Sequence, residues 1–109
     1  MKYIRYIGFL FLFIIVNAQE SEPEEVLFVG NSFTFYFNLP LVVESMAKEK
    51  GIPLNITQST AGGASLKDHW SGKRKLSTRS LIQRKSFSKV VLQDYSTNPV
   101  MKTEESLTY

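Results

Sequence analysis

The 109-residue sequence contains no cysteine and only one histidine, His69. Without cysteine, the chain can form neither a disulfide framework nor a thiolate metal site. The same absence excludes lipid attachment of the bacterial lipoprotein type, because no cysteine stands near a cleavage site. The fold must therefore be held by its packed core, and we expect no metal and no other cofactor.

Long apolar runs are also absent: no run reaches the length of about 20 residues that a transmembrane helix needs. A shorter run, residues 7–16, follows the basic Lys2 and Arg5 and precedes the small residue Ala18. A basic start, a short apolar stretch and a small residue before the cleavage point are typical of secretory signal peptides. We therefore predict that residues 1–18 are a signal peptide cleaved after Ala18, and that the protein is secreted or periplasmic without a stable membrane anchor.

Acidic residues are missing between positions 73 and 89, where seven basic residues stand: Lys73, Arg74, Lys75, Arg79, Arg84, Lys85 and Lys89. Such a run can bind phosphates or anionic lipid head groups. Apart from Phe87 it lacks aromatic residues for base stacking, which favours a solvated helix instead. Removal of the signal peptide leaves 11 basic and 10 acidic residues, so the net charge is near +1 and we expect no nucleic-acid partner.

Three segments have the composition of β-strands. Residues 26–29 and 90–93 are mainly apolar and typical of strands that are covered on both faces of a parallel sheet. Residues 54–59 alternate and include β-branched side chains. Between the segments 26–29 and 54–59, Asn38 as N-cap and Gly51 as stop signal predict a helix. These patterns together predict an α/β fold.

The first of these strands runs directly into Gly30-Asn31-Ser32. The glycine permits a tight bend and the approach of a ligand, and the serine is presented at the carboxyl end of the strand. This tripeptide after a hydrophobic strand resembles the first block of the SGNH (GDSL-type) hydrolases, where Gly-Asp-Ser carries the nucleophilic serine. Asparagine here replaces the aspartate. The resemblance covers almost all of residues 25–100 and implies that Ser32 is the nucleophile of an ester hydrolase.

The resemblance also implies a flavodoxin-like, three-layer α/β/α fold with a parallel sheet. SGNH domains have five strands, whereas the 91 residues after the predicted signal peptide have material for about three. We therefore expect residues 26–109 to be the N-terminal part of an SGNH hydrolase-like domain, truncated after about three strands. Residues 19–25 are expected to form an exposed lead-in.

In these hydrolases, hydrogen-bond donors stabilise the oxyanion that forms during ester cleavage, and the resemblance assigns three of them here. The backbone N–H of Ser32 is the first. The second is a glycine after the second strand, for which Gly63 is preferred and Gly62 is the alternative. The third is an asparagine in a Gly-x-Asn-Asp block that this sequence lacks, so Asn98 and Gln93 remain as alternatives.

The catalytic base is the part of the pattern that this sequence does not supply. SGNH hydrolases carry it in an Asp-x-x-His block near the C-terminus of the domain, whereas His69 stands beside Trp70 in a predicted helical segment. We therefore interpret His69 as structural or substrate-lining, place Asn31 among the substrate-lining residues, and regard the chain as catalytically incomplete as given. The implied substrate is a small-molecule or carbohydrate ester. The alternative function is a secreted non-catalytic binding or structural module.

Residues 33–37, directly after the serine, are strongly aromatic. We expect most of these rings to form core under the first helix, because aromatic side chains are ordinary core material. The other interpretation is the lip of an acyl pocket, a role that Phe33 and Tyr36 can combine with packing.

The signal-peptide prediction has a direct consequence for the exported protein. Cleavage after Ala18 makes Gln19 the mature N-terminus. N-terminal sequencing of exported protein is expected to begin at Gln19, and exported protein that retains Met1 would instead indicate a membrane anchor.

Overall fold

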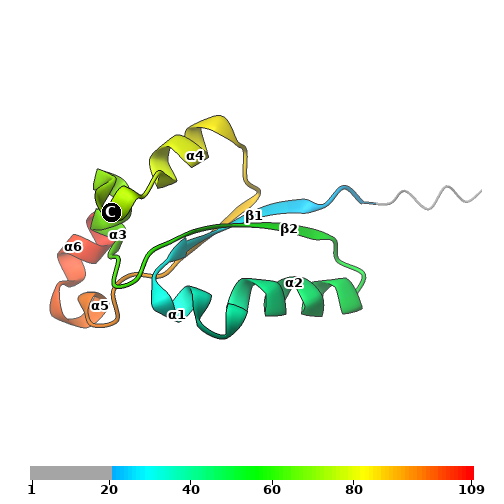
Figure 1. Cartoon of the computed structure of the whole chain (residues 1–109), viewed down its shortest axis with the longest axis horizontal. Coiled ribbons are helices and arrows are strands. Elements are labelled where there is room, and N and C mark those ends of the chain that lie inside the picture. The colour runs from blue at the N-terminus through cyan, green and yellow to red at the C-terminus, as the bar shows by residue number, and fades with distance from the viewer. Residues whose placement is uncertain (1–20) are drawn as a thin grey trace, which may run out of the picture.

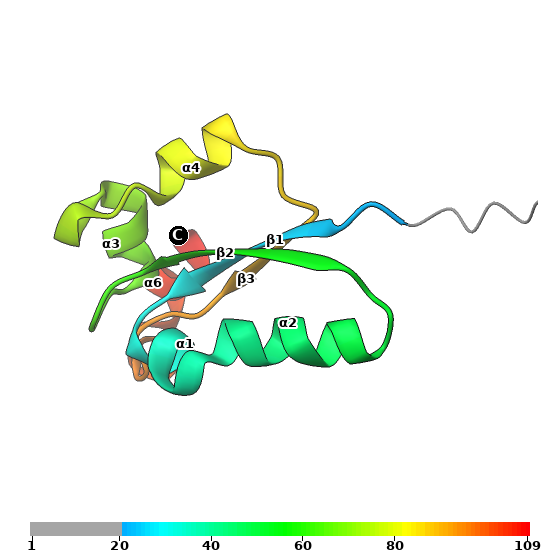
Figure 2. The same ribbon diagram turned by 45° about the vertical axis from the view of Figure 1, so that its right-hand side comes forward.

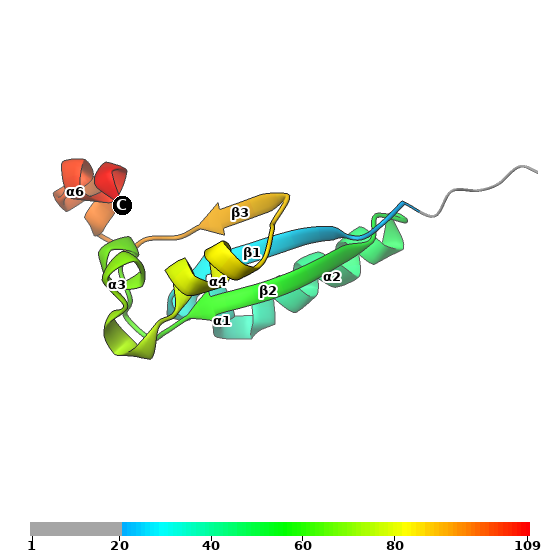
Figure 3. The same cartoon turned by 90° about the horizontal axis from the view of Figure 1, so that it is seen from above.

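The computed structural model describes residues 21–109, so the predicted signal peptide lies outside the described residues. Three parallel strands form one sheet in the order β2-β1-β3 (Figures 1 and 3): β1 (Glu24–Gly30), β2 (Leu54–Thr60) and β3 (Lys89–Leu92). This is the order of the first three strands in a flavodoxin-like sheet. The predicted α/β fold with a parallel sheet is confirmed. All three predicted strands are present, but β1 begins at Glu24, so Glu24 and Glu25 belong to the strand and not to the expected exposed lead-in.

Helices flank both faces of the sheet. α2 (Leu39–Glu49) lies along one face and α4 (Thr78–Arg84) lies over the other (Figures 1 and 3). The other helical segments are short: α1 (Ser32–Phe35), η1 (Tyr36–Asn38), α3 (Leu66–Ser71), η2 (Lys73–Lys75), α5 (Asn98–Met101) and α6 (Thr103–Thr108). None of the helices in residues 21–109 is long and apolar enough to cross a membrane.

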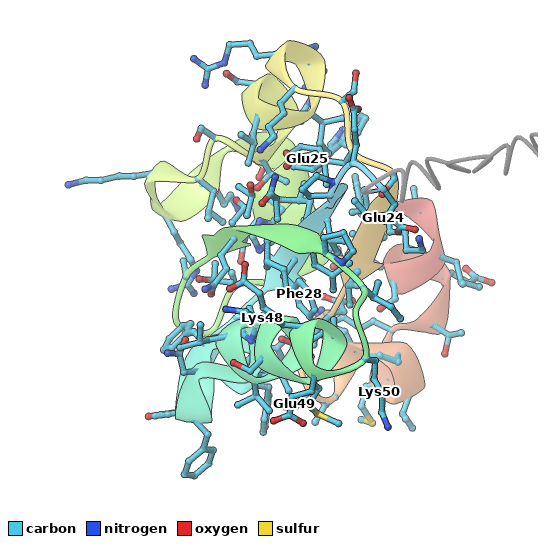
Figure 4. All side chains as sticks on the ribbon, turned by 90° about the vertical axis from the view of Figure 1, so that its right-hand side faces the viewer. Glu24, Glu25, Phe28, Lys48, Glu49 and Lys50 are labelled. Atoms are coloured by element: carbon cyan, nitrogen blue, oxygen red, sulfur yellow. The ribbon has the colours of Figure 1, made fainter. Side chains whose placement is uncertain are left out.

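The core is built on β1, because both faces of this central strand are covered. Leu27 and Val29 are buried on the face toward α3 and α4. Three apolar side chains pack against them there: Leu66, Leu81 and Phe87. Val26 and Phe28 point to the opposite face, since side chains alternate along a strand, and Figure 4 shows Phe28 between the sheet and α2. Burying one such side chain contributes about 1.5–3 kcal/mol.

α2 has the predicted extent, but only its C-terminus uses the predicted signal. Gly51 has a φ of +71°, and its N–H donates to Lys48 O at 3.0 Å. The N–H of Ile52 donates to Ala47 O at 2.9 Å. These two bonds form a Schellman motif, whose left-handed position favours glycine. At the N-terminus, Asn38 is itself left-handed and its side chain makes no capping bond, so the predicted side-chain cap is wrong.

The basic run does not form one continuous helix. It is divided between the 3-10 turn η2, the helix α4, the loop after α4 and the first residue of β3. Within the described residues, three of its basic side chains form ion pairs: Arg74 with Asp68 (3.5 Å), Lys85 with Glu25 (2.6 Å) and Lys89 with Glu24. Exposed ion pairs contribute only about 0–1 kcal/mol each. Their main effect here is to neutralise part of the positive charge of the run.

The aromatic segment after the serine is exposed, so the expectation that it forms core is wrong. Phe33, Tyr36 and Phe37 are 64%, 61% and 97% exposed. The reason is local, because α1 ends after four residues and the next turn, η1, contains a left-handed residue at Phe37 (φ +54°). That conformation costs a non-glycine residue about 1–2 kcal/mol.

The β3 strand leaves apolar surface uncovered in the part of the chain that the structure describes. Val90, Val91 and Leu92 are 44%, 42% and 56% exposed. Val91 pairs with Phe28 and therefore shares the α2 face of the sheet. The other two line a cavity of about 200 Å³ on the α4 face. An apolar edge strand of this kind can pair with a strand of another molecule.

The open β3 edge predicts that the purified protein self-associates as its concentration rises. We expect Val91→Lys to reduce this association, because a charged side chain on an edge strand disfavours further pairing. Gln83→Lys is the matched control, since it adds the same charge at an exposed position of α4. Light scattering over a concentration series compares the three proteins. Equal association of Val91→Lys and the parent would show that β3 is not the pairing edge.

Candidate functional site

Three loops meet at one end of the sheet, because parallel strands all present their carboxyl ends at the same edge. The turn after β1 leads into Ser32 at the start of α1, the loop after β2 carries Gly63, and the loop after β3 carries Gln93. Figure 2 shows α1, α3 and α6 gathered at this end. The fold therefore brings residues that are up to about sixty positions apart in sequence to one edge of the sheet.

The turn after β1 is closely packed at Gly30. A Cβ atom at this position would collide with the hydroxyl of Thr34 and would lie 2.8 Å from Gln93 Oε1. The Gln93 oxygen accepts hydrogen bonds from the N–H of Asn31 (3.0 Å) and from the hydroxyl of Thr34 (3.1 Å). Glycine is therefore required here by the approach of two side chains of the chain itself.

Asn31 is almost fully buried, with 1% of its surface exposed, and its side chain turns inward. Its Nδ2 donates to Ala64 O at 2.9 Å and to Asp94 O at 3.2 Å. Its Oδ1 accepts from the N–H of Phe33 at 3.1 Å, which caps α1. One side chain thus links the loops that follow all three strands. This place differs from the substrate-lining position that the sequence suggested for Asn31.

Ser32 is the first residue of α1 and is partly exposed. Among residues 21–109, neither its hydroxyl nor its backbone N–H has a hydrogen-bonding partner, and the N–H of Gly63 is also unpaired within this range. Gly63 has a φ of +64° in a turn that the N–H of Ala64 closes on Ala61 O at 3.1 Å. A positive φ at the third position of such a turn favours glycine. A hydroxyl and two backbone donors are thus available at the strand ends.

The two alternatives for a side-chain donor, Gln93 and Asn98, lie in different surroundings. The Gln93 carboxamide contacts the turn that carries Ser32, through the two bonds that its Oε1 accepts, and its Nε2 donates to Asp94 O. Asn98 is buried at the start of α5, where its Nδ2 donates to Asp94 Oδ1 at 3.4 Å. Of the two side chains, Gln93 is the one in contact with the serine turn.

His69 lies in α3 with 3% of its surface exposed, and both ring nitrogens are hydrogen-bonded. Its Nε2 lies 2.9 Å from Gly30 O, and because a carbonyl only accepts, Nε2 donates this hydrogen bond. Its Nδ1 is hydrogen-bonded to the hydroxyl of Thr78 at 2.7 Å, and this hydroxyl is hydrogen-bonded in turn to that of Ser59 at 2.7 Å. In this place His69 supports the end of β1 and is not directed at Ser32.

Asp94 is the residue of this region that the sequence patterns did not reveal. Its Oδ1 accepts from the N–H groups of Leu66 (2.9 Å) and Tyr95 (2.7 Å), and its Oδ2 accepts from the hydroxyl of Ser106 (2.5 Å). Burial acts to raise the pKa of Asp94, but the hydrogen bonds from Ser106, Leu66 and Tyr95 outweigh it and hold the pKa below its usual value. The only signal in the sequence is an aspartate directly after the predicted strand at residues 90–93.

Residues 21–109 contain no group of three or more acidic or histidine side chains placed to hold a metal ion. The chain matches no family model, no curated protein and no solved structure.

Asp94→Asn is expected to destabilise the protein near neutral pH by about 1–3 kcal/mol, because hydrogen bonds to a charged acceptor are lost. A carboxyl whose pKa is lowered by folding contributes stability above its unfolded pKa of about 3.9, and this contribution is lost as the pH falls through the folded value. The difference between the two proteins should therefore shrink below about pH 4. Urea unfolding across a pH series measures this difference in the free energy of unfolding between the parent and Asp94→Asn. A difference that is constant at every pH would contradict a charged role for Asp94.

Proposed function

We propose that this protein is a serine ester hydrolase of the SGNH type, with Ser32 as the nucleophile. The observation that supports the proposal most strongly is the junction made by Asn31, which links the serine turn to the loops that carry Gly63 and Gln93. Nucleophilic catalysis needs a serine hydroxyl held close to donors that face the developing oxyanion. These three loops supply the serine hydroxyl and the hydrogen-bond donors.

In the proposed reaction the Ser32 oxygen attacks the carbonyl carbon of the ester while a base takes the hydroxyl proton. The carbonyl oxygen becomes an oxyanion, which the N–H groups of Ser32 and Gly63 and the Nε2 of Gln93 stabilise. The alcohol leaves with the proton that the base returns, and water then hydrolyses the acyl-serine to release the acid. Loss of one oxyanion donor in such a site lowers the rate by about 10²–10³.

The base of this proposal comes from outside the 109 residues. His69 is the only histidine of the sequence, and its two nitrogens are engaged with Gly30 and Thr78 beneath the surface. A base must lie within hydrogen-bond reach of the proton that it takes. The resemblance suggests an Asp-x-x-His segment further along the reading frame as its source.

The proposed substrate class is a carbohydrate-borne or other small ester, in keeping with the predicted export of the protein. The exposed rings of Phe33 and Tyr36 directly follow the serine and offer apolar faces to an acyl group or a sugar ring. Aromatic rings supply large apolar contact areas, and tyrosine adds a polar group at its edge.

A secreted, non-catalytic binding module is the second candidate function. The engagement of both His69 nitrogens favours it, because the described residues then contain no histidine able to activate Ser32. The same exposed aromatic rings serve a binding module equally well.

Labelling with a fluorophosphonate separates the two functions, since this reagent reacts with an activated serine. The protein encoded by the complete reading frame should be labelled at Ser32, and Ser32→Ala should abolish both labelling and hydrolysis of an activated acetyl ester. Ser45→Ala, at an exposed position of α2, is the matched control and should leave both unchanged. Absence of labelling in the complete protein would favour the binding module.

A further inference from the structure

The structure gives position 31 a specific chemical requirement. Two backbone carbonyl oxygens, Ala64 O and Asp94 O, converge on the side chain of this residue from different loops. Both can only accept hydrogen bonds, so the group between them must supply two donors. The Nδ2 of Asn31 has two N–H groups and satisfies both carbonyls, while its Oδ1 satisfies the N–H of Phe33. An amide is the side chain that meets all three demands at once.

An aspartate has nearly the same shape but cannot meet these demands in its charged form. A carboxylate has no donor, and its oxygen would face the two carbonyl oxygens in a site where 1% of the residue is exposed. Burial of a charge without a partner is costly, and the group then takes up a proton instead. The protonated acid regains one of the two donors.

We propose that Asn31 is a positioning residue whose side-chain amide holds Ser32 at a fixed place relative to the N–H of Gly63 and the carboxamide of Gln93. This role rests on the proposed function, in which those three groups act on one substrate carbonyl. The amide itself touches no substrate, because it is buried and its hydrogen-bonding groups are engaged within the chain.

The test compares Asn31→Asp with Asn31→Ala, because only the first variant carries a group that titrates. Folding raises the pKa of the introduced carboxyl above its unfolded value of about 3.9, since burial and the two carbonyl oxygens oppose its charge. A raised pKa gives stability that is present at low pH and is lost as the pH rises through the folded value. The Asn31→Ala variant loses the same bonds without this dependence on pH.

Other ionisable groups also contact these loops, and each measurement is therefore expressed relative to the parent protein at the same pH. These groups are Asp94 on the loop after β3, His69 on α3, and the ion pair between Asp68 and Arg74. All of them are present in the parent and in both variants, so the relative values report on position 31.

The first measurement is urea unfolding of the protein encoded by the complete reading frame, between about pH 4 and about pH 8. The Asn31→Asp midpoint should fall below that of the parent by about 1 M in urea at the upper end of this range and recover toward the lower end. The Asn31→Ala deficit should stay constant. Equal deficits of the two variants at every pH, including failure of both to fold, would overturn the requirement for an amide.

The second measurement is the rate of fluorophosphonate labelling at Ser32 under conditions where each variant is folded. Displacement of a reacting group by about 1 Å can lower a rate by about 10²-fold. We expect a loss of this order in Asn31→Asp at high pH, with partial recovery as the pH falls.

Parent-like labelling in both folded variants would overturn the positioning role and leave the proposed function standing. No labelling in the parent itself would refute the proposed function, while the unfolding data would still decide whether position 31 needs an amide.

Discussion

The arrangement at the carboxyl end of the sheet depends on one buried amide. Asn31 follows the central strand directly, and its side chain donates to a carbonyl from each of the two neighbouring loops. A polar group buried in this way is costly unless it is hydrogen-bonded, and a fully satisfied network fixes its members relative to one another. The position of Ser32 relative to the loops after β2 and β3 is therefore set by the residue that precedes it.

Three other features make this junction possible. Gly30 leaves room for Thr34 and Gln93, so the loop after β3 can approach the turn after β1. His69 on α3 donates a hydrogen bond to the carbonyl of Gly30. Asp94 fixes the start of α3, because it accepts a hydrogen bond from the N–H of Leu66. The apolar core packed against β1 holds the strand that leads into the junction. Polar contacts between loops thus complete a fold whose stability comes from a small set of buried aliphatic side chains.

The sequence was informative wherever a local pattern determines the structure. The strands, the parallel sheet and the end of α2 at Gly51 follow from hydrophobic periodicity and from the conformational freedom of glycine. The part that failed depends on contacts between distant segments. Nothing local indicates that Asn31 turns inward or that Asp94 accepts hydrogen bonds from α3 and α6. The exposure of the aromatic rings after Ser32 has a local cause instead, the left-handed conformation of Phe37 in η1, which hydrophobic composition does not predict.

The exchange of the Asn31 side-chain amide hydrogens with solvent tests the central claim most directly. Both Nδ2 hydrogens are buried and donate to carbonyl oxygens, so both should exchange slowly by NMR in deuterated solvent. The side chain of Asn38, at an exposed position before α2, is the internal reference and should exchange fast. Slow exchange of both Asn31 hydrogens is the predicted result. Exchange of the Asn31 amide as fast as that of Asn38 would contradict the account.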